Sequence, residues 1–144
     1  MAITFQNNFK NILTKLKNIM TTEFGNSFPV VVGQEDIVGN QYIRLEPLGS
    51  ELSEYNVTHE IREYTISIQM FYAGTNIKKN ILDHILRKVS HLEALIQNNI
   101  SMTLTDSSEC FNCRLESTEL NTGEDEEYYL VEWVWIGQHM ENVG

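Results

Sequence analysis

The chain has 144 residues, which predicts a single domain over residues 1–144. Its composition, with 42% hydrophobic and 21% charged residues, is that of a globular protein rather than a disordered one. The formal net charge of −10 excludes tight, phosphate-driven nucleic-acid binding and docking on an anionic membrane, because both need clustered Lys and Arg.

Targeting signals are not expected. Lysines interrupt residues 1–20, so this segment lacks the unbroken apolar core of a signal peptide. No run of about 18 apolar residues is present to span a membrane. Two cysteines do not make the disulfide framework of a secreted protein, which favours a reducing compartment.

The first predicted element is an amphipathic helix over residues 4–23. Its apolar side chains recur at helical spacing on one face: Phe5, Phe9, Ile12, Leu13, Leu16, Ile19 and Met20. Gly25 then stands where a helix C-cap or the following turn is expected.

Three strands are predicted next. Residues 28–33 form a short β-branched run, and Pro29 suits the start of a strand because its missing N–H does no harm there. Residues 42–48 form the second strand, and residues 49–57 are a loop or a long hairpin extension. Residues 59–72 alternate between apolar and polar side chains, which indicates a half-buried antiparallel strand.

A second amphipathic helix is predicted over residues 76–98, with Thr75 as its N-cap. Residues 100–104 give a weak strand pattern, and residues 111–120 and 128–140 give clear ones. The fold class is therefore α+β. Two amphipathic helices pack on one face of a mainly antiparallel sheet of four to six strands, in the order α-β-β-β-α-(β)-β-β.

The last strand is apolar on both faces. One face carries Tyr129, Val131, Trp133 and Trp135, and the other carries Tyr128, Leu130, Val134 and Ile136. Two helices cover only one face of a sheet, so the second apolar face needs a loop or another molecule over it. We interpret Tyr129, Val131, Trp133 and Trp135 as a candidate oligomer or partner interface. The alternative is that the long loops fold over the tryptophans.

Motifs for catalysis or metal binding are missing from the sequence. It contains no phosphate-binding glycine pattern, no nucleophile elbow and no His-Glu-x-x-His motif, so we predict no enzyme and no cofactor. Cys110 and Cys113 form a lone C-x-x-C at the start of a strand, where extended chain would hold them about 10 Å apart. We interpret them as structural thiols. His84 and His91 lie seven residues apart on a helix and cannot share a metal ion.

An acidic run forms the predicted turn before the last strand: Glu124, Asp125, Glu126 and Glu127. The run lacks the alternating spacing of a calcium loop. It is interpreted as a solvated hairpin tip, with a functionally negative surface as the alternative.

The order of elements resembles the tail terminator (tail-completion) proteins of long-tailed bacteriophages. The resemblance rests on the helix at residues 5–20, the strand at 29–32, the long strand at 63–72, the helix at 77–96 and the hairpin ending in 128–136. It spans nearly the whole chain and is one of length, order and pattern. No short functional motif is shared, so no residue is assigned a role from the family.

The resemblance implies a structural virion protein, found in the host cytoplasm during assembly. Such proteins form a ring, usually a hexamer, on the end of the tail tube, where they stop tube growth and present the surface that joins the head. Their partners are further copies, the tail tube protein and a head-completion or neck protein, and DNA passes through without specific binding. The residues from Glu124 to Glu127 are then candidates for an acidic lumen or surface. The alternatives are a head-closure or neck adaptor protein and an acidic DNA-mimic inhibitor.

Overall fold

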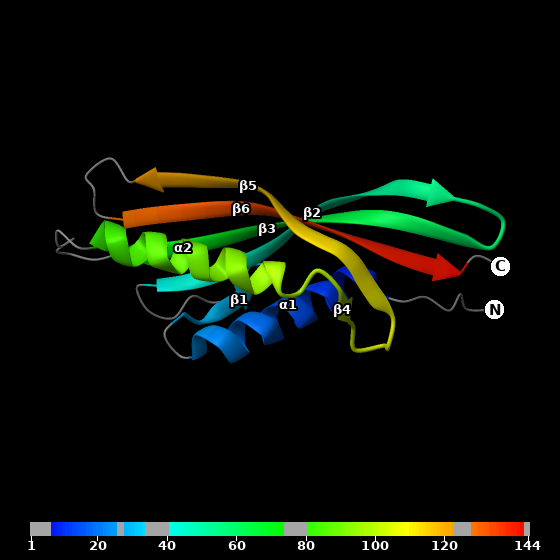
Figure 1. Ribbon diagram of the computed structural model, residues 1–144, viewed down its shortest axis with the longest axis horizontal. Coiled ribbons are helices and arrows are strands. Elements are labelled where there is room, and N and C mark those ends of the chain that lie inside the picture. Colours follow the sequence, from blue (N-terminus) through cyan, green and yellow to red (C-terminus); the bar gives the residue numbers. More distant parts are fainter. Residues whose placement is uncertain (1–6, 26–27, 34–40, 74–80, 123–127, 143–144) are drawn as a thin grey trace.

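The computed structural model describes residues 7–25, 28–33, 41–73, 81–122 and 128–142. Two helices and a six-stranded sheet make up this part of the chain (Figure 1), which confirms the α+β class. The elements follow one another as α1 (Asn8–Phe24), β1 (Val30–Val32), β2 (Gln41–Tyr55), β3 (His59–Ala73), α2 (Ile81–Gln97), β4 (Met102–Thr103), β5 (Glu109–Thr122) and β6 (Tyr128–Asn142).

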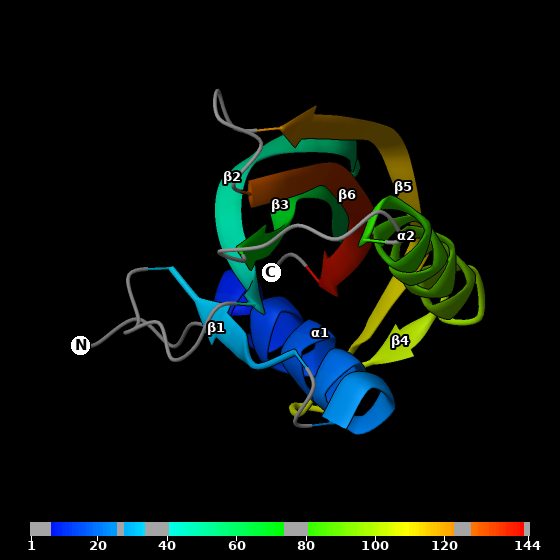
Figure 2. The same ribbon diagram turned by 90° about the vertical axis from the view of Figure 1, so that its left-hand side faces the viewer.

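The sheet has the strand order β1-β2-β3-β6-β5-β4. Its orientation is mixed, because β1 runs parallel to β2 whereas the other neighbouring strands are antiparallel. The end-on view in Figure 2 shows the sheet arching over the helices, so that α1 and α2 lie on its concave side. The opposite, convex face carries neither helix.

The core fills the space between the concave face and the helices. β3 and β6 are paired in register, and the pairs Ile66–Trp135 and Ile68–Trp133 are buried there. The helices contribute the stripes that the sequence spacing predicts, namely Ile12, Leu13, Leu16 and Met20 from α1 and Ile85, Leu92 and Ile96 from α2. Burial of these apolar side chains is the main force that holds the two layers together.

Both ends of α1 are capped within the described residues. The Asn7 side chain accepts a hydrogen bond from the backbone N–H of Lys10. Gly25 adopts φ +61°, and its N–H bonds the Thr21 carbonyl. The predicted helix start at Thr4 lies outside the described residues.

The C-terminal end of α1 contacts the middle of α2. His91 Nε2 of α2 lies 2.7 Å from Glu23 Oε1 of α1. The Lys88 ammonium group stands 5.7 Å from the ring centres of Phe24 and Phe28. The predicted start of the second helix at Asn76 and its N-cap Thr75 lie outside the described residues.

The hairpin of β2 and β3 is longer than the helices that it passes, and its distal part projects beyond them (Figure 1). We call residues 48–61 the arm. Residues 49–55 form the long hairpin extension that the sequence gives as the alternative to a loop. The strand thus continues through Pro47 and past residue 48, where the sequence predicts its end. It does so because β1 pairs only with residues 43–45 of β2, so no ladder bond on the outer edge needs the missing N–H. The tip is held by Asn56 Oδ1, which accepts hydrogen bonds from the backbone N–H groups of Thr58 and His59.

Candidate functional site

The predicted interface residues of the last strand lie in the core. Trp133 and Trp135 are 0% exposed, Val131 is buried, and Tyr129 packs against the same core. The interpretation of these four residues as an open partner surface is therefore corrected. This face of β6 packs in the same core as both helices, together with its equally apolar cross-strand neighbours Ile66 and Ile68 of β3.

The face of the sheet without helices carries the other apolar side chains of β6. Leu130, Val134 and Ile136 are half-buried on this convex face. They alternate with Glu132, which stands directly opposite Glu119 of β5. The convex face therefore mixes apolar and acidic side chains, and the facing glutamates make it unsuited to gripping phosphate.

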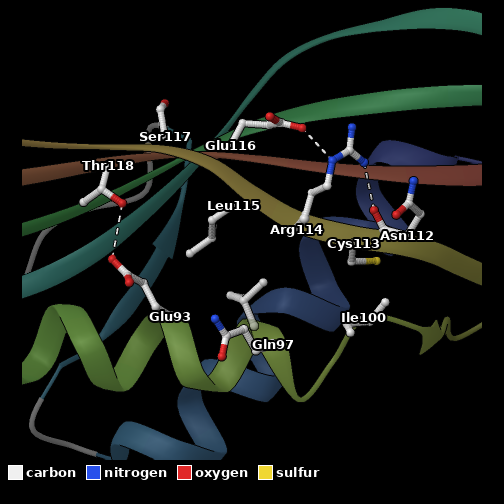
Figure 3. Close-up of a pocket in the computed structure, with 11 residues that line it drawn as sticks. Glu93, Gln97, Ile100, Asn112, Cys113, Arg114, Leu115, Glu116, Ser117 and Thr118 are labelled. Atoms are coloured by element: carbon white, nitrogen blue, oxygen red, sulfur yellow. Dashed lines mark hydrogen bonds and ion pairs between the residues drawn. The ribbon is translucent and has the colours of Figure 1, made fainter.

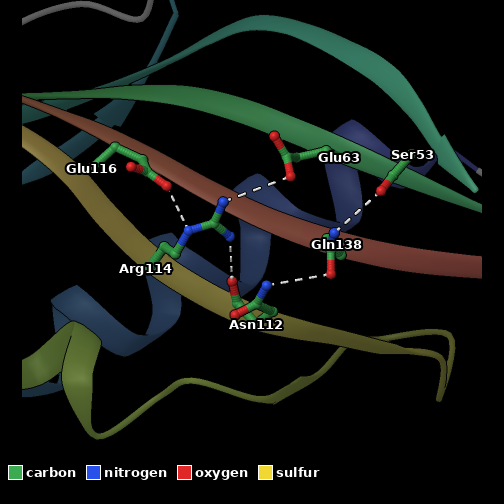
Figure 4. A network of polar contacts seen from close by, with 6 residues as sticks. All are labelled: Ser53, Glu63, Asn112, Arg114, Glu116 and Gln138. Atoms are coloured by element: carbon green, nitrogen blue, oxygen red, sulfur yellow. Dashed lines mark hydrogen bonds and ion pairs between the residues drawn. The ribbon is translucent and has the colours of Figure 1, made fainter.

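A polar network joins four strands, β2, β3, β6 and β5, on the convex side (Figure 4). The Arg114 guanidinium lies 2.5 Å from Glu116 Oε1 and 3.6 Å from Glu63 Oε2, and it donates a hydrogen bond to the Asn112 carbonyl. Gln138 Nε2 donates to Ser53 Oγ on the arm. These partly exposed contacts contribute little energy each, but together they link the arm to β6 and β6 to its neighbours.

A groove lies between α2 and β5, with a volume of about 440 Å³ (Figure 3). We call it the α2–β5 groove. Its lining residues are Glu93, Ile96, Gln97 and Ile100 beside the helix, and Asn112, Cys113, Arg114, Leu115, Glu116, Ser117 and Thr118 on the strand. Thr118 Oγ1 donates a hydrogen bond to Glu93 Oε1 across it. Ile96, Leu115 and Cys113 give the groove an apolar floor beneath a polar rim.

The two cysteines lie closer together than an extended strand allows. Their sulfur atoms are 3.7 Å apart, which corrects the expected separation of about 10 Å. The reason is an irregularity in β5, where Asn112 adopts φ +54° and the pairing with β6 shifts register. The hydrogen-bonded contact with the Cys113 thiol and burial both raise the pKa of the Cys110 thiol, so it stays protonated and unreactive.

Sequence analysis overlooked a Ser, His and Asp cluster near the start of β5. The Ser108 hydroxyl donates to Asp106 Oδ1 at 2.5 Å, and His139 Nε2 lies 2.9 Å from Ser108 Oγ. In a hydrolytic triad the serine hydroxyl donates its hydrogen bond to one histidine ring nitrogen, and the carboxylate accepts a hydrogen bond from the other. Here the Asp106 carboxylate accepts the hydrogen bond of the Ser108 hydroxyl, so the cluster fastens a turn to β6. The hydrogen bond from Ser108 lowers the pKa of the Asp106 carboxyl. In the sequence, only the Asp-x-Ser spacing indicates this cluster.

Other predicted features remain outside these contacts. The acidic run Glu124, Asp125, Glu126 and Glu127 lies outside the described residues. Within the ranges that the structure covers, no three His, Cys, Asp or Glu side chains gather as a metal site. No helix among them is long and apolar enough to cross a membrane.

No protein-family model matches the chain, and no curated protein matches its sequence. Among solved structures, 35 chains are similar to it in fold. One of them, a protein known only by a serial designation, superimposes with a TM-score of 0.62, and the match covers 95% of each chain. The two sequences are 11% identical, so the likeness establishes a shared fold and nothing about function.

Proposed function

We propose that the chain is the structural ring subunit that terminates a phage tail. The observation that carries the proposal is that the subunit has a buried core and still exposes apolar side chains in two separate places. The arm exposes Leu48, Leu52, Tyr55 and Val57, and the convex face presents the apolar side chains of β6. Apolar surface in distinct, non-equivalent places fits a subunit that repeats one head-to-tail contact until the ring closes.

The charge of the chain supports the same proposal. Facing acidic side chains such as Glu119 and Glu132 repel phosphate, so DNA would pass such a ring without being held. The expected partners are further copies of the chain, the tail tube protein and a head-completion or neck protein. In the finished particle the chain belongs to the virion, and before that to the host cytoplasm.

A tube-growth assay tests the proposal. Tubes grown from the tail tube protein encoded in the same genome are mixed with the chain during polymerisation and viewed by electron microscopy. We expect a cap at one end of each tube and tube growth that stops once the cap is bound. Tubes that continue to grow and carry no cap would contradict the proposal. A chain that binds the head vertex but never the tube would instead be a head-closure or adaptor protein.

A further inference from the structure

The arm exposes four large apolar side chains to water. Leu48, Leu52, Tyr55 and Val57 are all at least half exposed within a segment of ten residues. The arm is nevertheless ordered, because its tip is closed by the Asn56 hydrogen bonds and its β2 strand is tied to β6 by the Gln138–Ser53 contact. An ordered segment binds at a lower entropic cost than a flexible one, which makes the arm a preformed contact surface.

The α2–β5 groove has an apolar floor and room for such side chains. A cavity of about 150 Å³ holds one benzene ring, so about 440 Å³ accepts roughly three side chains of that size. The apolar character extends past both ends of the groove, because Ile100 at one end and Leu120 beyond Thr118 are large apolar side chains exposed to water.

We propose that the arm of one subunit seats its apolar side chains in the α2–β5 groove of a second copy of the chain. The inference rests on the proposed function, since it names the contact that would build the ring. Within one subunit the arm leaves the molecule on the side away from α2 (Figure 1), so it does not fill its own groove. Arm and groove are different surfaces, and their contact is therefore head-to-tail.

The contact consists of side chains rather than an added strand. Pro47 removes one backbone donor from the free edge of β2, and the register of β2 shifts at Pro47/Gly49 and again at Leu52/Glu54. These features interrupt a continuous hydrogen-bond ladder and protect the edge from uncontrolled pairing. The arm therefore binds through its apolar side chains.

The contact is weak when it forms singly. About a dozen residues on each side is roughly half of a standard protein interface. Charge does not strengthen the contact, because the arm carries Glu51 and Glu54 and the groove rim carries Glu93, whereas Glu116 is paired with Arg114. Salt screens such exposed charges over about 8–10 Å, so assembly is expected to strengthen as salt is raised.

Three single variants test the contact. Leu52→Asp places a charge on the arm, and Gln97→Trp fills the groove from an exposed helix position. Leu86→Asp is the matched control, because Leu86 is 45% exposed against 50% for Leu52 and lies on α2 outside the groove. Mass is measured by light scattering at high salt and on tail tubes, and thermal unfolding checks that each variant is folded.

We expect Leu52→Asp and Gln97→Trp each to weaken assembly at least tenfold, while Leu86→Asp assembles like the parent. An equimolar mixture of the two defective variants should form dimers and nothing larger, because only one intact arm meets one intact groove. Folded arm and groove variants that assemble like the parent would overturn this contact and leave the proposed function standing. Variants that keep the ring but lose the tube would show that the tube protein occupies the groove. A parent that assembles under no condition would overturn both proposals.

Discussion

The indole ring of Trp135 occupies the space above Gly137 in β6. A Cβ atom at Gly137 would stand 2.4 Å from Cη2 of Trp135 and 2.9 Å from Cys110 Sγ. The ring is fully buried, so it has no room to withdraw. Glycine is therefore required here for a close approach of side chain to backbone.

This relationship predicts a large cost for Gly137→Ala. Overpacking a dense core costs about 1–3 kcal/mol, and we expect a loss of about 2 kcal/mol in the free energy of unfolding. Gly49→Ala is the control, since a Cβ at Gly49 meets nothing within 4 Å. Urea unfolding of both variants checks the prediction, and equal stability of the two would contradict the packing described.

The tryptophans are expected to behave as core residues. Trp133→Ser and Trp135→Ser should each destabilise the subunit by about 3–5 kcal/mol, as for other large truncations in a core. The chain has two tryptophans, so its native fluorescence reports on these two rings alone. Native emission should be blue-shifted and poorly quenched by acrylamide. Strong quenching in the folded monomer would place the rings at the surface.

Tyr64 predicts a specific loss of stability at alkaline pH. Burial raises the pKa of Tyr64 above its ordinary value of 10.0, and its hydroxyl accepts a hydrogen bond from Asn8 Nδ2. The neutral hydroxyl therefore stabilises the fold below pH 10, and this stability is lost as pH rises through the raised pKa.

Tyr64→Phe should cost about 1 kcal/mol at pH 8, where it removes the acceptor for Asn8. The difference in unfolding free energy between parent and variant should shrink above pH 10, because only the parent has a proton to lose at this position. Denaturant unfolding at intervals from pH 8 to 11 measures both values. A difference that stays constant over that range would show that Tyr64 is not linked to folding.

The thiols are expected to be structural and protected. Neither Cys110 nor Cys113 should react with a thiol reagent in the native protein at pH 8, and both should react after unfolding. The double change Cys110→Ser with Cys113→Ser should fold and lose less than about 3 kcal/mol. Stoichiometric zinc in the parent that disappears with these substitutions would contradict this role.

Sequence periodicity predicted the elements because each buries a single face. The stripe through Ile12 and Leu16 in α1, and the alternation of Ile66 with Ser67 in β3, allow one solution each. The pattern of β6 allows either face to be the buried one, since Trp135 and Ile136 are both apolar. Contacts with β3 and the helices decide which one faces inward, and that information is not local.

The candidate site depends on features that periodicity does not encode. The distance between the cysteines follows from the left-handed backbone of Asn112, which a strand pattern does not predict. The length of the arm follows from β2 continuing through Pro47, which is tolerated only because the outer edge of the strand is free there. The groove joins α2 to β5, which are separate in sequence, so only the assembled fold reveals it.

The mass of the assembled chain tests the central claim most directly. Light scattering over a range of protein and salt concentrations, with and without tail tubes, should find one closed species. A hexamer of 16.7 kDa subunits would have a mass of about 100 kDa. That species should form more readily as salt screens the net charge of −10 on each subunit. A chain that stays monomeric in every condition, tubes included, or that grows without limit, would contradict the ring.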